Sequence, residues 1–240
     1  MSVEWGKLYV FSNWKNLVRY ISVMEGDNME YSVVIVAAGS GARMNLGYNK
    51  VYYKINGVPI LQMAMSLFIW DEDCKQIVVV TDNHDYRTHI KDNAKGKVVI
   101  AKGGETRQDS VANGLEAVIC DKVMIHDGAR PYLDEETLMA VKRELESEEA
   151  VCVMVPCTDT IKKVDEGYIV ETIPRNTLMA AQTPQAFSTE LIRTCMKRAQ
   201  EDHYIGTDDC SLVEKYSTTP IKIVEGTFEN KKITTLEDLK

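Results

Sequence analysis

The feature that most constrains this chain is a run of four β-branched residues, at 33–36, that leads directly into a run of small residues. A continuous β-branched run predicts a strand that is buried on both faces, as in a parallel sheet. The small residues let backbone N–H groups approach an anion closely, because little or no side chain stands in the way. They are Ala37, Ala38, Gly39, Ser40 and Gly41. Because Arg43 and Lys50 follow on the same segment, we interpret the loop as a cradle for a triphosphate.

Two familiar phosphate-binding patterns do not fit this loop. It begins at Gly39 as G-x-G-x-x-G, but Met44 stands where dinucleotide-binding folds need a third glycine for close helix–strand packing. The Walker A pattern, G-x-x-x-x-G-K-S/T, does not occur here either. On this segment alone, a plain turn between a strand and a helix, with glycine needed only for its geometry, is an open alternative.

The composition fits a globular protein and argues against some partners. The 240 residues suit one large domain or a domain with an appendage. With 45% hydrophobic and 27% charged residues, the chain can bury a substantial core. The 36 acidic residues outnumber the 28 basic ones, and the net charge of −8 argues against general binding to nucleic acid or to anionic membranes. A small phosphorylated ligand needs only local cations, so it is compatible with this charge.

The cysteines show no metal-binding or redox pattern. None of the six forms a C-x-x-C pair, and several lie in apolar runs, where a free cysteine behaves as a small hydrophobic residue. The chain also shows no secretory signal and no segment of transmembrane length. We therefore expect a protein of the reducing cytoplasm.

Residues 1–30 do not follow the pattern of the rest. They mix aromatic residues with lysines and an arginine, and a Gly-Asp-Asn break at 26–28 precedes Met29. We interpret this stretch as an N-terminal extension outside the core, or as the result of a start codon placed too early, with Met29 as the functional start. An amphipathic helix that binds a partner is the alternative, but the hydrophobic periodicity is poor. The core is then a single domain, residues 31–240.

From residue 31 onward, strand-like and helix-like segments alternate, which predicts an open α/β sheet of mostly parallel strands flanked by helices. Ligands then belong at the carboxyl ends of the strands. The expected strands are residues 33–36, 76–80, 98–100, 123–125, 151–155 and 221–224. The expected helices are residues 60–70, 84–93, 110–119, 135–146, 188–201 and 207–216.

Two segments add to this plan. Residues 158–170 alternate around Asp165-Glu166-Gly167, which predicts a β-hairpin. A two-stranded ribbon is marginally stable alone, so we expect it to pack on something, such as a second copy of the chain. Near the end, the Thr-Leu-Glu-Asp sequence at 235–238 resembles a capping box that starts a last helix.

Polar residues gather where the expected strands end. A Gly-Gly turn at 103–104 leads into a helix whose first turn carries Arg107 and Ser110, an arrangement that can hold a polar ligand at the helix N-terminus. After the fourth expected strand comes Asp127, which can hold Mg²⁺ or a substrate hydroxyl, or be an ordinary turn aspartate. We interpret the neighbouring His126 as a buried core histidine rather than as a catalytic residue.

The motifs become more specific when they are taken together. Each block alone is a weak signal, but the blocks occur in one order and cover nearly all of the chain from Tyr31 onward. They are residues 37–44, 50, 103–111, 126–131, 159–162, 174–175, 182–185, 207–209, 225–226 and 230–234. In this combination the chain resembles the bacterial 2-C-methyl-D-erythritol 4-phosphate cytidylyltransferase family.

The resemblance implies a Rossmann-like, GT-A-like nucleotidyltransferase fold, an α/β sheet flanked by helices with a projecting β-arm. It also implies the reaction. A phosphate oxygen of 2-C-methyl-D-erythritol 4-phosphate attacks the α-phosphorus of CTP in line, pyrophosphate leaves, and 4-diphosphocytidyl-2-C-methyl-D-erythritol forms. Such a transfer depends mainly on positioning and charge stabilisation. Mg²⁺ is the expected cofactor, bridging CTP phosphate oxygens.

The resemblance also assigns roles to single residues. Arg43 and Lys50 match the two cations that stabilise the transition state at the α-phosphate, and they are the expected catalytic residues. The expected nucleotide-binding residues are Ala37, Ala38, Gly39, Ser40, Gly41, Gly104, Arg107 and Ser110. The expected substrate-binding residues are Asp127, Arg130, Thr160, Arg175, Thr183 and Lys232. Asp127 is also the candidate metal ligand.

In the family, the ribbon after the fifth strand is an arm that carries substrate-binding residues into a partner's site. By resemblance, residues 157–175 form this arm, the active unit is a homodimer, and Thr160 and Arg175 act in the neighbouring subunit. One departure concerns Asn49, which stands where the family often has proline. We expect it to loosen the backbone before Lys50.

Two other functions are open at this point. Ribitol-5-phosphate cytidylyltransferases share the fold and the nucleotide, although residues 159–162 and 174–178 favour the methylerythritol substrate. A nucleotide-binding protein without turnover is the second alternative, but both expected catalytic cations are present. Pyrophosphate release with one polyol phosphate or the other distinguishes the first alternative, and CTP binding without turnover would indicate the second.

Overall fold

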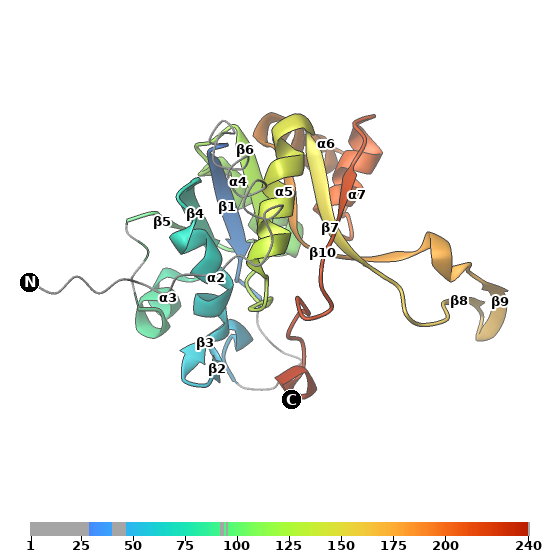
Figure 1. Ribbon diagram of the computed structural model, residues 1–240, viewed down its shortest axis with the longest axis horizontal. Helices are drawn as coiled ribbons and strands as arrows, with labels where there is room; N and C mark the ends of the chain where they lie inside the picture. The colour runs from blue at the N-terminus through green and yellow to red at the C-terminus, as the bar shows by residue number, and fades with distance from the viewer. Residues whose placement is uncertain (1–28, 40–46, 92–93, 95, 240) are drawn as a thin grey trace, which may run out of the picture.

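The computed structural model describes residues 29–39, 47–91, 94 and 96–239, and its centre is a seven-stranded sheet (Figure 1). The strands are β1 (Tyr31–Val36), β4 (Cys74–Val80), β5 (Val98–Ala101), β6 (Lys122–Asp127), β7 (Ala150–Pro156), β10 (Met179–Ser188) and β11 (Lys222–Glu225). Across the sheet their order is β11-β7-β10-β6-β1-β4-β5. The expected α/β architecture is confirmed. The predicted N-terminal extension lies outside the described residues, except for its last two positions.

The strands of the sheet pair in parallel, with one exception. β1 lies between β4 and β6 and is parallel to both, β4 is parallel to β5, and β7 is parallel to β11. β10 runs antiparallel to its neighbours β6 and β7. The predicted mostly parallel sheet is confirmed, but the sequence predicts no strand at β10. Pro184 explains the omission, because a proline argues against an interior strand; the structure places it where the β10–β7 register shifts, between Ala181 and Gln185.

Helices cover both faces of the sheet. They are α2 (Ile60–Trp70), α3 (Asn83–His89), α4 (Arg107–Glu116), α5 (Glu135–Ser147), α6 (Thr189–Glu201) and α7 (Asp209–Tyr216). None of these helices, within the described ranges, combines the length and the apolar character that crossing a bilayer requires.

The alternation of side chains along β1 shows how the two layers form. Val33 and Ile35 belong to the core cluster that α2 and α5 complete, and Val34 belongs to the cluster on the other face, with α4, α6 and α7. All three side chains are fully buried. The continuous β-branched run is therefore a strand covered on both sides, as predicted.

Capping residues decide where two helices begin, and they shift the expected boundaries. α4 starts at Arg107 rather than at residue 110, because Thr106 and Asp109 form a capping box. α3 starts after Asp82, whose side chain accepts hydrogen bonds from two backbone N–H groups, and it ends at His89 rather than at residue 93. The early start of α4 brings Arg107 to the carboxyl edge of the sheet.

Short elements complete the body. η2 (Lys50–Tyr52) is a 3₁₀ turn, and β2 (Lys54–Ile55) and β3 (Val58–Pro59) form a small hairpin; the sequence predicts none of them. The last element is η4 (Leu236–Leu239). The Asp238 side chain accepts hydrogen bonds from the N–H groups of residues 234 and 235, so the expected cap is present, on a 3₁₀ helix.

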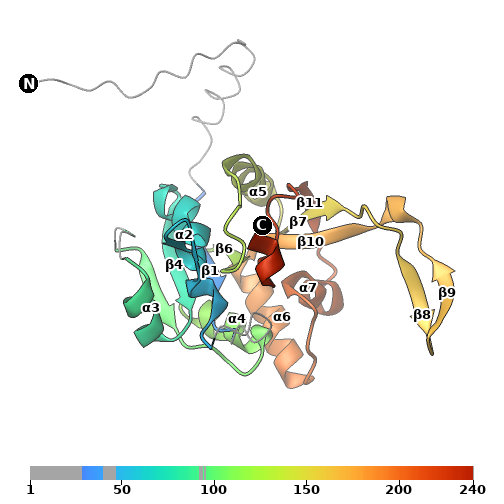
Figure 2. The same ribbon diagram turned by 90° about the horizontal axis from the view of Figure 1, so that it is seen from below.

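The segment after β7 leaves the body of the molecule as a two-stranded arm (Figure 1 and Figure 2). β8 (Lys162–Asp165) pairs antiparallel with β9 (Tyr168–Thr172), which confirms the predicted hairpin, and its turn has positive φ at Glu166 and Gly167. The 3₁₀ turn η3 (Arg175–Thr177) leads back to β10. Every residue of β8 and β9 is exposed, so neither strand is buried against the described body.

At Gly114, helix α4 packs closely on the sheet. A Cβ at this position would lie 2.5 Å from Val34 Cγ1 and 2.8 Å from Val80 Cγ2, both on fully buried, branched side chains. Alanine favours the helix by about 1 kcal/mol, but contacts this short place the overpacking cost at the upper end of its usual range, about 2–3 kcal/mol. We therefore expect Gly114→Ala to lower the free energy of unfolding in urea by about 1–2 kcal/mol.

The control for this prediction is Glu116→Ala, at an exposed position of the same helix. It should change the free energy of unfolding by no more than about 0.5 kcal/mol. A Gly114→Ala protein as stable as the wild type would contradict the close packing between α4 and β1.

Candidate active site

A cavity of about 590 Å³ opens at the carboxyl ends of β1 and β6. Its walls come from the loop after β1, from η2, from the turn before α4, from the end of β6 and from the segment after β11. It brings together nine of the predicted site residues, namely Ala37, Ala38, Gly39, Lys50, Gly104, Arg107, Ser110, Asp127 and Lys232. Ser40, Gly41 and Arg43 lie outside the described residues. The structure thus provides a cavity at the strand ends, where the topology predicts the ligand.

The turn before α4 packs closely against the loop after β1. A Cβ on Gly103 would collide with Ala38, and a Cβ on Gly104 would collide with the first turn of α4, so both positions need glycine. Ser110 supports this turn, because its Oγ accepts a hydrogen bond from the Gly104 N–H at 3.0 Å. Ser110 is buried, so it shapes this side of the cavity from behind.

Asn49 supports the loop from the other side, and the expectation that it loosens the backbone is wrong. Its Nδ2 donates to the Ala37 carbonyl at 2.5 Å, and its Oδ1 accepts from the Val51 N–H at 3.3 Å. The side chain therefore caps η2 and ties the loop after β1 to the segment that carries Lys50. A proline side chain could form neither hydrogen bond. With Asn49, two hydrogen bonds hold the segment where the ring of a proline would restrict the backbone.

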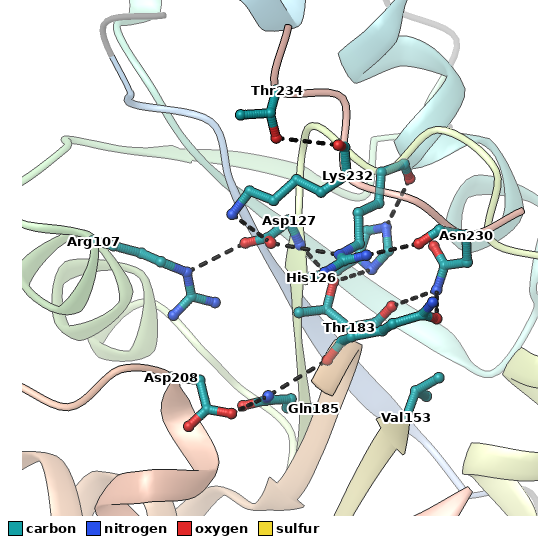
Figure 3. Close-up of polar contacts among 12 residues, drawn as sticks. Arg107, His126, Asp127, Val153, Thr183, Gln185, Asp208, Asn230, Lys232 and Thr234 are labelled. Atoms are coloured by element: carbon teal, nitrogen blue, oxygen red, sulfur yellow. Dashed lines mark hydrogen bonds and ion pairs between the residues drawn. The ribbon is translucent and has the colours of Figure 1, made fainter. Parts of the chain in front are cut away.

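Three cations surround the carboxylate of Asp127 at the end of β6, and Figure 3 shows two of them, Arg107 and Lys232. Arg107 Nε lies 3.2 Å from Oδ1, Lys232 Nζ lies 2.8 Å from Oδ2, and Arg130 Nε lies 3.6 Å from Oδ2. Burial alone would raise the pKa of Asp127, but the three cations lower it well below its usual range. One ionised carboxylate therefore gathers cations from α4, from the loop after β6 and from the segment after β11.

A neutral polar layer lies behind this carboxylate. Thr183 Oγ1 accepts from the Asp127 N–H at 3.0 Å and lies 3.0 Å from His126 Nδ1. His126 Nε2 lies 3.1 Å from the Arg130 carbonyl. Because a carbonyl only accepts, the ring carries its proton on Nε2 and Thr183 donates to Nδ1.

The environment of His126 keeps its ring uncharged. Burial lowers the pKa of His126 to about 4. The prediction of a satisfied core histidine is confirmed. Thr183, predicted to bind substrate, holds the backbone of Asp127 in this structure.

Asn230 holds the segment after β11 over the site. Its Nδ2 donates to Gln182 Oε1 at 3.1 Å and to the Thr183 backbone carbonyl at 2.9 Å. The backbone carbonyl of Asn230 accepts from Arg130 Nη1 at 2.7 Å. These contacts place Lys232 beside the carboxylate of β6. The sequence reasoning assigns Asn230 no role, although it lies in one of the blocks that carry the family resemblance.

Thr160 and Arg175 do not reach the cavity within one chain. Neither residue lines it, and both are exposed. They lie at the two ends of the arm, which projects away from the body (Figure 2). Arg175 Nη1 donates to the Thr158 carbonyl at 2.7 Å and so ties the two ends of the arm together. A single chain therefore keeps these two predicted substrate-binding residues apart from the others.

The described part of the chain offers no metal site made of protein ligands alone. Its His, Cys, Asp and Glu residues form no group of three or more that could hold a metal ion. Asp127 already shares both carboxylate oxygens with cations. Mg²⁺ often needs only one or two carboxylates when substrate phosphates supply further ligands. Asp127 thus fits as a metal ligand only together with a bound nucleotide.

The buried His126 should affect the acid stability of the fold. Its ring stays neutral in the folded protein down to about pH 4, whereas in the unfolded chain it gains a proton below about pH 6.5. Because the unfolded state binds more protons between these values, stability falls as the pH falls. We expect this histidine to lower the free energy of unfolding by about 2 kcal/mol between about pH 7 and about pH 5. His126→Gln should not show this loss.

Urea unfolding of both proteins at the two pH values measures the slope of the free energy of unfolding against pH. His84→Gln, at an exposed position, is the control and should keep the wild-type slope. The same pH dependence in the wild type and in His126→Gln would contradict a neutral buried ring.

Known proteins are similar to this chain over the region that carries the site. The family model of 2-C-methyl-D-erythritol 4-phosphate cytidylyltransferase matches residues 31–240. The protein of that name from Clostridioides difficile (strain 630) is 42% identical over 216 residues, which cover 87% of this chain and 90% of the relative. The one from Bacillus mycoides (strain KBAB4) is 40% identical over 215 residues, which cover 87% of this chain and 94% of the relative.

Solved structures agree with this result. The crystal structure of 4-diphosphocytidyl-2C-methyl-D-erythritol synthase from Anaerococcus prevotii DSM 20548 superposes with a TM-score of 0.79 and 29% identity, over 89% of this chain and 96% of that one. The 2-C-methyl-D-erythritol 4-phosphate cytidylyltransferase of Francisella tularensis superposes with a TM-score of 0.76 and 30% identity, over 88% and 96%. The chain therefore belongs to the 2-C-methyl-D-erythritol 4-phosphate cytidylyltransferase family, as its sequence motifs predict.

Proposed function

We propose that this chain transfers the cytidylyl group of CTP to 2-C-methyl-D-erythritol 4-phosphate and releases pyrophosphate. The product is 4-diphosphocytidyl-2-C-methyl-D-erythritol, an intermediate of non-mevalonate isoprenoid biosynthesis. The observation that carries the proposal is the cavity in which the loop after β1 and Lys50 face the cations around Asp127. Family membership over residues 31–240 supports both substrates. The names of the relatives favour methylerythritol phosphate over ribitol 5-phosphate.

The charges in the cavity suit the chemistry of this transfer. A phosphate monoester loses its second proton with a pKa of about 6, so the attacking oxygen is an anion near neutral pH and needs no general base. This oxygen bonds to the α-phosphorus while the bond from that phosphorus to pyrophosphate breaks. Because two anions must approach each other, compensation of negative charge is the main requirement. Lys50 and the cations around Asp127 provide positive charge for it.

On the nucleotide side, the backbone of residues 37–41 and of Gly104 binds CTP together with Arg107. Ser110 contributes by fixing the turn at Gly104, whose N–H donates to its Oγ. Lys50 and Arg43 stabilise the charge that develops at the α-phosphate. These assignments follow the position of the described residues in one cavity and the match of the chain to its family.

On the polyol side, Lys232 binds the substrate phosphate, and Arg130 lies beside it on the same carboxylate. Both now pair with the Asp127 carboxylate, and 38% of the Lys232 side chain is exposed, so an incoming ligand can reach it. A phosphate carries more negative charge than a carboxylate and attracts these cations more strongly. Asp127 would then keep Arg107 as its partner and accept hydrogen bonds from the polyol hydroxyls, with Thr183 holding its backbone.

The setting of the reaction is also part of the proposal. Asp127 would be the protein ligand of a Mg²⁺ ion that enters together with CTP. When bound, Mg²⁺ neutralises charge on the triphosphate. The compartment is the reducing cytoplasm, which the six free cysteines support.

The active unit in this proposal is a homodimer joined through the arm, residues 157–175. The arm carries apolar side chains that the body does not cover; the most exposed of them, Tyr168, is 78% exposed. These side chains are Ile161, Val164, Tyr168, Ile169 and Val170. Packing of the arm on a second copy would cover them and would carry Thr160 and Arg175 to the cavity of the partner.

The proposed function predicts pyrophosphate release from CTP and Mg²⁺ that requires 2-C-methyl-D-erythritol 4-phosphate and does not occur with ribitol 5-phosphate. Lys50→Ala should lower kcat by about 10²–10³, because one positioned charge is lost from the transition state. Lys54→Ala, a matched change at an exposed position nearby, should turn over like the wild type.

Three outcomes would contradict these assignments. Release with ribitol 5-phosphate only would change the substrate, and release with neither polyol phosphate would remove the transferase function. Equal turnover of Lys50→Ala and the wild type would remove Lys50 from the transition state.

The dimer predicts complementation between two inactive variants. Each site would take Lys50 from one chain and Arg175 from the other, so a mixed dimer of Lys50→Ala and Arg175→Ala has one site with both residues intact. After unfolding and refolding of an equal mixture, we expect about a quarter of the wild-type activity, because half of the dimers are mixed and one of two sites in each is complete. If the mixture stays as inactive as its components, Arg175 does not act in the neighbouring subunit.

A further inference from the structure

Arg107 is held by a second carboxylate that the proposed function does not use. Its Nε lies 3.2 Å from Asp127 Oδ1, and its Nη2 lies 2.9 Å from Asp209 Oδ2. Arg107 is the first residue of α4, Asp127 is the last residue of β6, and Asp209 is the first residue of α7. One guanidinium thus joins three elements, and its Nη1 takes part in neither contact.

Asp209 lies where a charge is unfavourable without a partner. Only 2% of its side chain is exposed, and a buried carboxylate destabilises a fold unless a cation and hydrogen bonds compensate it. Burial raises the pKa of Asp209, and Arg107 acts in the opposite direction. Asp209 does not line the cavity, but its ion-pair partner Arg107 does.

The position of Asp209 is itself fixed from the sheet by Gln185, a buried residue of β10. Gln185 Oε1 accepts hydrogen bonds from the N–H groups of Asp209 and Cys210, each at 3.0 Å. Gln185 Nε2 donates to Asp208 Oδ2 at 2.7 Å (Figure 3). Because β10 pairs with β6, the start of α7 is tied to the strand beside the one that carries Asp127. Both carboxylates that hold Arg107 therefore belong to one rigid frame.

We propose that Asp209 is a positioning residue for the transfer reaction, which fixes the plane of the Arg107 guanidinium beside the cavity. With one carboxylate partner, the planar guanidinium group could rotate about that contact. Partners at both Nε and Nη2 fix the orientation of its plane. A correctly oriented cation matters because a small misplacement of a binding group costs a large part of the rate. This inference rests on the proposed function and extends it to a residue outside the cavity.

The test is a double-mutant cycle in kcat/KM, made once wild-type turnover with 2-C-methyl-D-erythritol 4-phosphate is established, so that the proposed function and this inference fail separately. Asp209→Asn keeps the shape of the side chain but removes its charge, and should lower kcat/KM by about tenfold or more. In an Arg107→Ala background, the same substitution should lower kcat/KM by less than about twofold, because no guanidinium is left to position. A purely structural role would make the two losses multiply.

The matched control is Glu214→Gln, which removes one charge from an exposed position of the same helix. It should stay within about twofold of the wild-type kcat/KM. Wild-type kcat/KM in Asp209→Asn, or losses that multiply in the double variant, would overturn the proposal. If Asp209→Asn alone does not fold, the comparison of kcat/KM between Arg107→Ala and the double variant tests the proposal. Equal kcat/KM of these two supports positioning through Arg107, and a further loss of about tenfold overturns it.

Discussion

The site depends on the negative charge of Asp127. Three cations from different segments lie around this carboxylate at the end of β6, which is an interior strand of the sheet. Without it, Arg107, Arg130 and Lys232 would repel one another in a partly buried space. The carboxylate therefore keeps a region of positive charge together. In the proposed reaction, phosphates would bind by exchange, because they would replace the carboxylate as partner of cations that are already assembled.

Neutral groups hold these charges in place. His126 stays uncharged at its buried position, so it adds no further cation next to Arg130. Thr183 and Asn230 act through hydroxyl, amide and backbone hydrogen bonds, which fix geometry without changing the net charge. Buried neutral groups thus set the positions, and the charged groups lie toward the cavity. Asp209 is the exception, a buried charge whose partner is Arg107.

Much of the fold follows from local patterns in the sequence. The β-branched run of β1, the alternation of strands and helices and the turn of the arm all depend on residues close together in the chain. β10 does not, because Pro184 interrupts its pattern and its place in the sheet comes from pairing with β6 and β7. The roles of Asn49 and Asp209 are also missed from the sequence, since each consists of contacts with another segment.

The sequence by itself determined where most of the strands and helices form and where glycines and cations follow the strands, because hydrophobic periodicity and backbone sterics act over a few residues. It also predicted that the polar ends of several strands meet, since parallel strands bring their carboxyl ends to one edge. Only the tertiary structure decided which cations share a carboxylate, that Asp209 holds Arg107 from 102 residues away, and that Thr160 and Arg175 lie apart from the cavity of their own chain. The reason is physical, because electrostatic interactions and hydrogen bonds depend on distance in space and not on separation along the chain.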